Sequence, residues 1–147
     1  MDIDNHQLSL GYLTGLASRL FNRLLTQRFK QIGIDMTAEQ WGVILVLKNS
    51  EPMTQNQISE LLYLEKSSVS RSIDGMEKRG WIVRQRSVID SRQKLVSLTQ
   101  KALDIVAQCS VIAEEVLRDV QQDVDNDSLQ RSQEALLQVI HKLRQFN

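Results

Sequence analysis

The sequence predicts a mainly α-helical protein that carries one small β ribbon of two or three strands. Glycine and proline, which interrupt helices, number six and one among 147 residues. Apolar residues recur every three or four positions along most of the chain, and they alternate with polar residues only between 81 and 98. This change from the helical to the strand period separates the ribbon from the helices on both sides.

The composition predicts one globular domain over 1–147 and no membrane-spanning segment. Hydrophobic residues make up 41% of the chain and charged residues 24%, which are ordinary values. No apolar run reaches the roughly 18 residues that a transmembrane helix needs. The first ten residues are acidic and lack the basic start of a secretion signal, so we expect a cytoplasmic protein.

Residues suited to catalysis or metal binding are few and scattered. Cys109 is the single cysteine and cannot form an intramolecular disulfide. His6 and His141 lie near opposite ends of the chain, with neither a metal-ligand cluster nor a nucleophile beside them. The sequence also lacks a glycine-rich phosphate loop. We therefore expect no enzyme, no cofactor and no metal.

Charge is distributed unevenly, although the net charge is zero. Residues 65–101 contain nine Lys or Arg against four Asp or Glu, whereas residues 102–147 contain four against eight. A local basic segment attracts phosphate over about a Debye length, whatever the total charge. The alternative is a solvated helix face with no binding role.

Long amphipathic helices are expected at both ends of the chain. The first spans about 8–32, with leucines at intervals of three and four residues. The last two span about 100–122 and 128–146, separated by the acidic, turn-forming segment 123–127. These helices are longer than a small domain needs to cover its own core. Some of their apolar surface should therefore meet another element or another chain.

Shorter helices are expected between them. Thr37 with Gln40, and Thr54 with Gln57, have the spacing of capping boxes, which start helices over about 38–49 and 55–62. A further helix spans about 65–79. The residues expected to be buried on the first of these helices are Trp41, Ile44, Leu45 and either Leu47 or the stem of Lys48. Two short helices joined by a tight turn predict a helix-turn-helix over about 54–79.

The helix over 65–79 should have two distinct faces. Val69, Ile73 and Met76 recur at helical spacing and predict its buried stripe. Its other face is rich in serine, lysine and arginine; small hydroxyls let a helix lie deep in a major groove, and cations reach phosphates or guanine edges. Ser67 or Ser68 could instead serve only as a helix cap. For Gly75 the sequence suggests only a close approach to a neighbour.

The ribbon is predicted over about 81–98, with strands flanking a polar turn at 88–93. Arg92 stands at the tip of this turn, and Asp90 lies two residues before it. Thr99 is placed to cap the next helix. A helix-turn-helix followed by a ribbon that presents an arginine is suited to DNA, and the two together predict one lobe over about 37–99.

These motifs resemble the MarR family of winged helix-turn-helix transcriptional regulators. The ribbon reads Asp90-Ser-Arg92-Gln-Lys-Leu-Val96-Ser-Leu98-Thr99, which matches the family pattern D-x-R-x-x-x-V-x-L-T at every specified position. Upstream, the chain reads Thr54-Gln-x-Gln-Ile-Ser-Glu-Leu-Leu, then Ser67-Ser-Val-Ser-Arg71, then Met76-Glu-Lys-Arg-Gly80-Trp-Ile-Val-Arg84.

The resemblance implies a two-fold dimer, or homodimer, formed by helices over about 8–32 and 100–146. Each chain would place its helix 65–79 in the major groove of a palindromic promoter site on double-stranded DNA. Arg92, oriented by Asp90, would enter the adjacent minor groove. We expect a repressor that a small aromatic or anionic ligand releases. The residues expected to contact DNA are Thr54, Gln55, Lys66, Ser67, Ser68, Ser70, Arg71, Arg84, Arg86, Asp90, Arg92 and Lys94.

Two other functions remain open. The winged helix could be a protein-interaction module without specific DNA binding, but its basic face argues against this, because protein interfaces are depleted in lysine. The chain could also be a thiol-based redox sensor through Cys109, although a cysteine on an apolar stripe is most often a small core residue. Effector-binding residues stay unknown, and candidates for holding an aromatic anion are Tyr12, Arg19, Arg23 and Trp41. The favoured alternative is that Trp41 and Tyr12 are core or interface residues and that the two arginines are solvated or near DNA.

Overall fold

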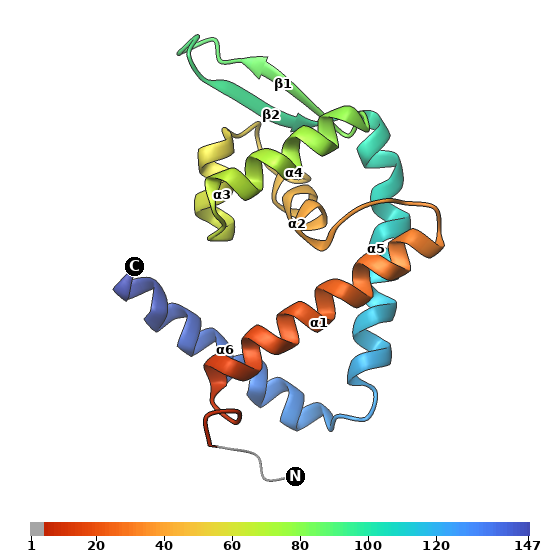
Figure 1. Ribbon diagram of the computed structural model, residues 1–147, viewed down its shortest axis with the longest axis vertical. Helices are drawn as coiled ribbons and strands as arrows, with labels where there is room; N and C mark the ends of the chain where they lie inside the picture. The colour runs from red at the N-terminus through yellow and green to blue at the C-terminus, as the bar shows by residue number, and fades with distance from the viewer. Residues whose placement is uncertain (1–4) are drawn as a thin grey trace. The chain divides into compact units, whose positions relative to one another are not determined.

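The structure, a computed structural model, describes residues 5–147 and confirms a mainly helical protein with a β ribbon (Figure 1). Residues 1–4, the start of the acidic N-terminal segment, lie outside the described residues. The chain forms two compact units, one up to Ile112 and one of Ala113–Asn147. The elements are α1 (Leu10–Gln31), α2 (Ala38–Leu47), α3 (Gln55–Leu62), α4 (Lys66–Lys78), β1 (Ile82–Arg86), β2 (Lys94–Leu98), α5 (Gln100–Gln121) and α6 (Asn126–Phe146).

Local side-chain signals set the starts of three helices. Thr37 Oγ1 accepts from the Gln40 N–H at 3.1 Å, and Gln40 Oε1 accepts from the Thr37 N–H at 3.0 Å. Thr54 and Gln57 form the same reciprocal pair at 3.1 and 2.9 Å. Thr99 accepts from the Ala102 N–H at 3.3 Å and donates to the Gly80 carbonyl at 2.5 Å. Thr99 therefore caps α5 and closes the ribbon at the same time.

The end of α4 is defined by Gly80, which has φ of 77°. In this left-handed conformation the N–H groups of Gly80 and Trp81 donate to the carbonyls of Glu77 and Met76, at 3.0 and 2.9 Å. Only glycine adopts such a φ without a steric penalty. The chain can thus reverse directly from α4 into β1.

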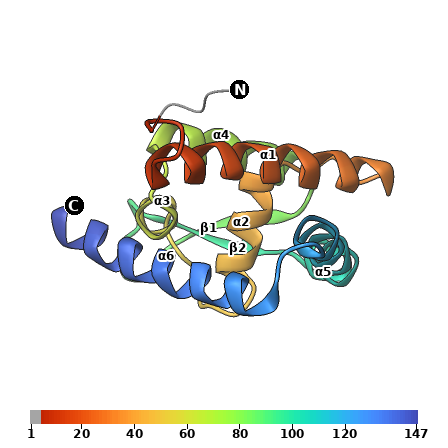
Figure 2. The same cartoon turned by 90° about the horizontal axis from the view of Figure 1, so that it is seen from below.

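A hydrophobic core joins α2, α3, α4 and the ribbon. The expected stripe on α4 is confirmed, because Val69, Ile73 and Met76 are fully buried. Helix α2 lies in the middle of the first unit, packed against α1, α3, α4 and β2 (Figure 2). The prediction for Leu45 is wrong: it is 48% exposed, since it falls opposite the buried face of α2, on which Val43 lies instead.

The ribbon is a two-stranded antiparallel sheet. Ile82 lies opposite Leu98 at its base, and Arg86 lies opposite Lys94 next to the turn. The third strand allowed by the sequence is reduced to one bridge, in which Met53 and Val96 exchange hydrogen bonds of 3.1 and 2.6 Å. This bridge ties the start of α3 to β2.

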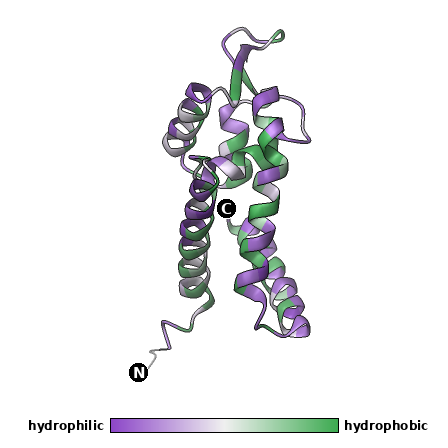
Figure 3. Ribbon diagram, turned by 90° about the vertical axis from the view of Figure 1, so that its right-hand side faces the viewer, coloured by the Kyte–Doolittle hydropathy of each residue, from purple (hydrophilic) through white to green (hydrophobic). Residues whose placement is uncertain are grey.

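Helix α6 makes up most of the second unit. This helix begins after Asp125, whose carboxylate accepts from the Ser128 N–H at 3.1 Å. None of its residues is buried within the chain. Leu137 and Phe146 are 66% and 80% exposed. Figure 3 shows hydrophobic and hydrophilic residues alternating along the helices of the chain. Within residues 5–147, every helix is too short or too polar to cross a lipid bilayer.

Candidate nucleic-acid interface

The outer face of α4 is polar and basic, as its sequence predicts. Lys66, Ser67 and Arg71 are exposed, and Ser70 is half-buried. Lys66 is the first residue of the helix, after Glu65, which makes no side-chain cap. The cationic side chains and hydroxyl groups on this face are of the kinds that reach phosphates and base edges.

Ser68 lies differently from the other serines. Its hydroxyl donates to Glu39 Oε1 of α2 at 2.7 Å, and Ser72, one turn later, donates to Glu39 Oε2 at 2.5 Å. One carboxylate therefore holds two successive turns of α4 against α2. Ser68 is among the residues expected to contact DNA, and its hydroxyl is here directed at α2. Its partner Glu39 lies 29 residues earlier in the chain, so no local sequence pattern indicates this contact.

Gly75 is explained by the neighbouring Gln40. The Gln40 side chain is buried, and its Nε2 donates to the Ser72 carbonyl at 3.3 Å. A Cβ atom on Gly75 would lie 3.1 Å from this Nε2 atom, closer than ordinary van der Waals contact. The close approach suggested by the sequence is thus an approach of α2 to the backbone of α4.

Arg84 is engaged within the protein. Its guanidinium contacts Asp74 at 2.7 Å and Glu77 at 3.0 Å, both on α4, and Gln55 Oε1 on α3 at 2.8 Å. The Arg84 side chain is only 15% exposed. These contacts make it a link between β1 and both helices of the helix-turn-helix. Arg84, which the sequence places among the expected DNA contacts, is thus largely enclosed by protein groups, and Gln55, also expected there, belongs to the same link.

The turn at the end of the ribbon orients Arg92. Asp90 Oδ1 accepts from the Arg92 N–H at 3.0 Å and from its Nε at 3.2 Å, and Asp90 Oδ2 accepts from Nη2 at 3.4 Å. The hydrogen bonds from Arg92 hold the pKa of the Asp90 carboxyl below its usual value. The Arg92 side chain itself is 90% exposed. The pair expected from the sequence thus forms, with its cation presented to solvent.

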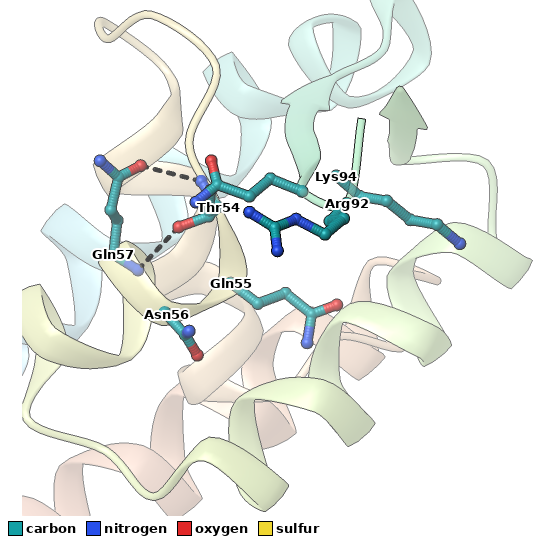
Figure 4. A pocket seen from close by; sticks show the side chains of 7 residues that line it. Thr54, Gln55, Asn56, Gln57, Arg92 and Lys94 are labelled. Carbon is teal, nitrogen blue, oxygen red and sulfur yellow. Dashed lines mark hydrogen bonds between the residues drawn. The ribbon is translucent and has the colours of Figure 1, made fainter. Parts of the chain in front are cut away.

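The β1–β2 ribbon with its turn is called the wing from here on. A hollow of about 440 Å³ lies between the wing and the start of α3. Figure 4 shows the Arg92 guanidinium pointing into this space, whereas Lys94 points away. Thr54 lines the hollow, but its hydroxyl is engaged in the capping box. Asn56, Gln57 and Gln93 line it too, and no sequence motif marked them as functional. A helix N-terminus beside an oriented arginine favours an anion.

Arg86 and Lys94 complete the basic surface. They lie opposite each other on β1 and β2, and both are exposed. With Arg92 they surround the turn with positive charge, which the Asp90 carboxylate partly offsets.

The four candidates for an effector site have different surroundings. Tyr12 is 46% exposed, and Arg19 is exposed on α1. Trp41 is buried with its ring edge-to-face against Phe29, at 5.7 Å between centroids. Arg23 lines a hollow of about 410 Å³ between α1 and the start of α2, together with Asn22, Thr26, Gln27, Thr37, Ala38 and Glu39.

Cys109 and the acidic or histidine side chains form no reactive cluster within residues 5–147. No group of three His, Cys, Asp or Glu that could hold a metal is present there. Cys109 is fully buried on α5, and this burial raises the pKa of its thiol to about 11. A thiol that stays protonated is a poor nucleophile, so these observations favour a structural role for Cys109.

Comparison with known proteins relates this chain to one family. The model of the MarR family matches residues 34–93. The HTH-type transcriptional regulator YwoH of Bacillus subtilis (strain 168) is 34% identical over 86 residues, 58% of this chain and 61% of that protein. The organic hydroperoxide resistance transcriptional regulator of the same strain is 32% identical over 93 residues, 57% and 63% of the two chains. The chain thus spans less than two thirds of these relatives.

Solved structures extend the similarity beyond this segment. The crystal structure of transcriptional regulator PA3341 is 28% identical, with a TM-score of 0.77 over 93% of this chain and 99% of that chain. The structure of reduced AbfR bound to DNA is also 28% identical, with a TM-score of 0.73 over 91% of each chain. The match over residues 34–93 relates this segment to the MarR family, and the chain shares its winged helix fold with flanking helices with these solved structures.

Proposed function

We propose that this protein is a homodimeric transcriptional regulator, a repressor, that binds a palindromic promoter site on double-stranded DNA. The wing arginine carries the proposal. Arg92 is exposed, is held by Asp90, and points over the start of α3. A cation oriented before binding loses less side-chain freedom when it enters a narrow minor groove. The similar AbfR fold bound to DNA supports this reading.

Helix α4, the proposed recognition helix, supplies the second contact surface. Lys66, Ser67 and Arg71 are exposed on the face of α4 away from the core. Glu39 holds the opposite face through Ser68 and Ser72. A helix fixed from behind can enter a major groove without losing its orientation, so its outer side chains can read base edges.

The flanking helices would join two copies of the chain. No residue of α6 is buried within one chain, and Leu143 and Phe146 are 53% and 80% exposed. On α1, Leu13 and Leu20 are 43% and 55% exposed. Monomeric proteins seldom leave large contiguous apolar patches uncovered. A second copy would cover these stripes and place two recognition helices on one palindrome.

A small anionic ligand would act from the hollow between α1 and the start of α2. Arg23 offers a cation there, and Glu39 also lines the space. Because Glu39 is the residue that holds Ser68 and Ser72, an occupant of this hollow would contact the group that positions α4. A ligand shifts the equilibrium only by its differential affinity for the two arrangements. Release of DNA would require weaker ligand binding in the DNA-bound arrangement.

Fluorescence anisotropy with a labelled duplex from the upstream region of its own gene tests the proposal. Arg71→Ala and Arg92→Ala should each weaken binding, by about 1–3 kcal/mol per half-site where a base edge is contacted. Lys30→Ala, at the exposed end of α1, is the matched control and should bind like the parent protein. Equal affinity of the parent for the promoter duplex and for a shuffled duplex at moderate salt would refute the proposal.

A further inference from the structure

Val88 and Ile89 form an aliphatic tip on the wing. Their exposed fractions are 102% and 97%, the highest among the large hydrophobic residues that the structure describes. They occupy the turn between β1 and β2, at the far end of the ribbon from α5 (Figure 1). Turns are usually formed by glycine, asparagine, aspartate and serine. The formation of the turn therefore does not explain why two β-branched aliphatic residues occupy these positions.

The turn is closed by hydrogen bonds that do not involve these side chains. Ser87 Oγ accepts from the N–H groups of Ile89 and Asp90, at 3.2 and 3.3 Å. The Ser87 N–H donates to the Gln93 carbonyl at 2.9 Å, and the Gln93 N–H donates to the Asp90 carbonyl at 3.0 Å. The turn is thus held by its own hydrogen bonds, and the side chains of Val88 and Ile89 take no part in them.

The charges around the tip indicate what it would contact. Arg86, Arg92 and Lys94 are exposed on the ribbon, and the Asp90 carboxylate is turned onto Arg92. The complementary partner is anionic and also offers apolar surface. The minor groove of DNA has both, because its phosphates flank sugar C–H groups, and unstacking a base step exposes the apolar faces of its base pairs. An anionic membrane would also attract such a tip, but it gives no reason to hold one arginine in a fixed orientation over α3.

We propose that Val88 and Ile89 enter the minor groove beside Arg92, where they pack against sugars or unstack a single base step. This inference rests on the proposed DNA-binding function and assigns it a further contact. Apolar side chains inserted in a minor groove bend or unstack the duplex, most readily at flexible pyrimidine–purine steps. The tip therefore adds an apolar contribution to the affinity for DNA. It also makes the protein prefer flexible base steps at positions of the DNA site that no polar side chain contacts.

The test compares the double variant V88S/I89S with R92A on the promoter duplex, over a range of salt concentrations. Because the aliphatic contact releases no counterions, V88S/I89S should weaken binding on the order of tenfold at every salt concentration. The slope of log K against log salt should stay unchanged. R92A should instead flatten that slope by about one counterion per lost phosphate contact. The conservative variant V88I/I89V should bind like the parent protein.

The outcomes separate this inference from the function on which it rests. A parent protein that shows no preference for the promoter would refute the proposed function. A parent that binds specifically, with V88S/I89S binding equally well, would overturn only the role of the tip. Vesicles of anionic phospholipid provide a second measurement. Sedimentation of the parent but not of V88S/I89S with vesicles, at unchanged DNA affinity, would assign the tip to membranes and overturn the inference.

Discussion

At the scale of single residues, the Gln40 side chain occupies the space beside Gly75, where α2 packs against α4. A glycine within a helix costs about 1 kcal/mol relative to alanine. Gly75 is nevertheless suited to its position, because a Cβ atom there would meet Gln40 Nε2 at 3.1 Å. The buried amide of Gln40 both caps α2 and donates to the Ser72 carbonyl, so it cannot move without losing hydrogen bonds.

This pair yields a double-mutant cycle. Gly75→Ala alone should fail to stabilise the protein, because the gain in helix propensity is offset by displacement of Gln40. In the Gln40→Ala background the same substitution should stabilise α4 by about 1 kcal/mol. Urea unfolding of the four proteins measures the coupling. Equal effects of Gly75→Ala in both backgrounds would show that Gln40 does not dictate the glycine.

The thiol of Cys109 gives a prediction for pH. Burial raises its pKa to about 11 in the folded protein, whereas the unfolded thiol has a pKa of about 8.5. The unfolded state therefore releases its proton first as pH rises. This group's contribution to the free energy of unfolding is present below the unfolded pKa and decreases as pH rises toward 11.

Alkylation by iodoacetamide at pH 7.5 checks the same feature. Folded Cys109 should react at least about a hundredfold more slowly than in urea-unfolded protein, because both its thiolate fraction and its access are reduced. Peroxide treatment should likewise leave DNA affinity unchanged. Rapid labelling of the folded protein, with loss of DNA binding, would instead support the alternative of a thiol sensor.

At the scale of elements, β1 is joined to the helix-turn-helix through Arg84. One guanidinium contacts Asp74, Glu77 and Gln55, and this link fixes the wing relative to α3 and α4. The two carboxylates are 56% and 45% exposed, so water screens the ion pairs. Arg84 therefore stabilises this link through the fixed geometry of its guanidinium N–H donors as much as through its charge.

Arg84→Ala should lower the free energy of unfolding by about 1–2 kcal/mol. Arg86→Ala is the matched control, because Arg86 is an exposed arginine two residues further along the same strand; it should change stability by less than about 0.5 kcal/mol. Thermal or urea unfolding measures both. Equal stabilities of the two variants would contradict the role assigned to Arg84.

The elements show why some features could be predicted and others could not. Thr37 with Gln40, and Thr54 with Gln57, lie three residues apart, so their capping boxes are visible in the sequence. Asp90 and Arg92 are two residues apart and were also predictable. The partner of Ser68 lies 29 residues away on another helix, and Arg84 meets groups on two helices only after the ribbon has folded back. Such contacts depend on packing.

At the scale of the whole molecule, the winged helix lobe and the flanking helices would have separate tasks in the proposed regulator. The lobe carries an oriented arginine, a helix α4 that Glu39 holds from behind, and a basic ribbon. The flanking helices carry exposed apolar stripes, most clearly on α6, where no side chain is buried within the chain. A single recognition helix offers too little contact for tight specific binding. In the proposed dimer, two chains paired through these stripes would double the contact with DNA.

A hydroxyl-radical footprint on the DNA upstream of its own gene tests the central claim most directly. Two wings and two recognition helices should protect two half-sites of an inverted repeat, with centres about one helical turn apart. Protection should include the adjacent minor grooves and should disappear with Arg92→Ala. Absence of any protected repeat, or protection spread evenly over unrelated DNA at moderate salt, would contradict the account.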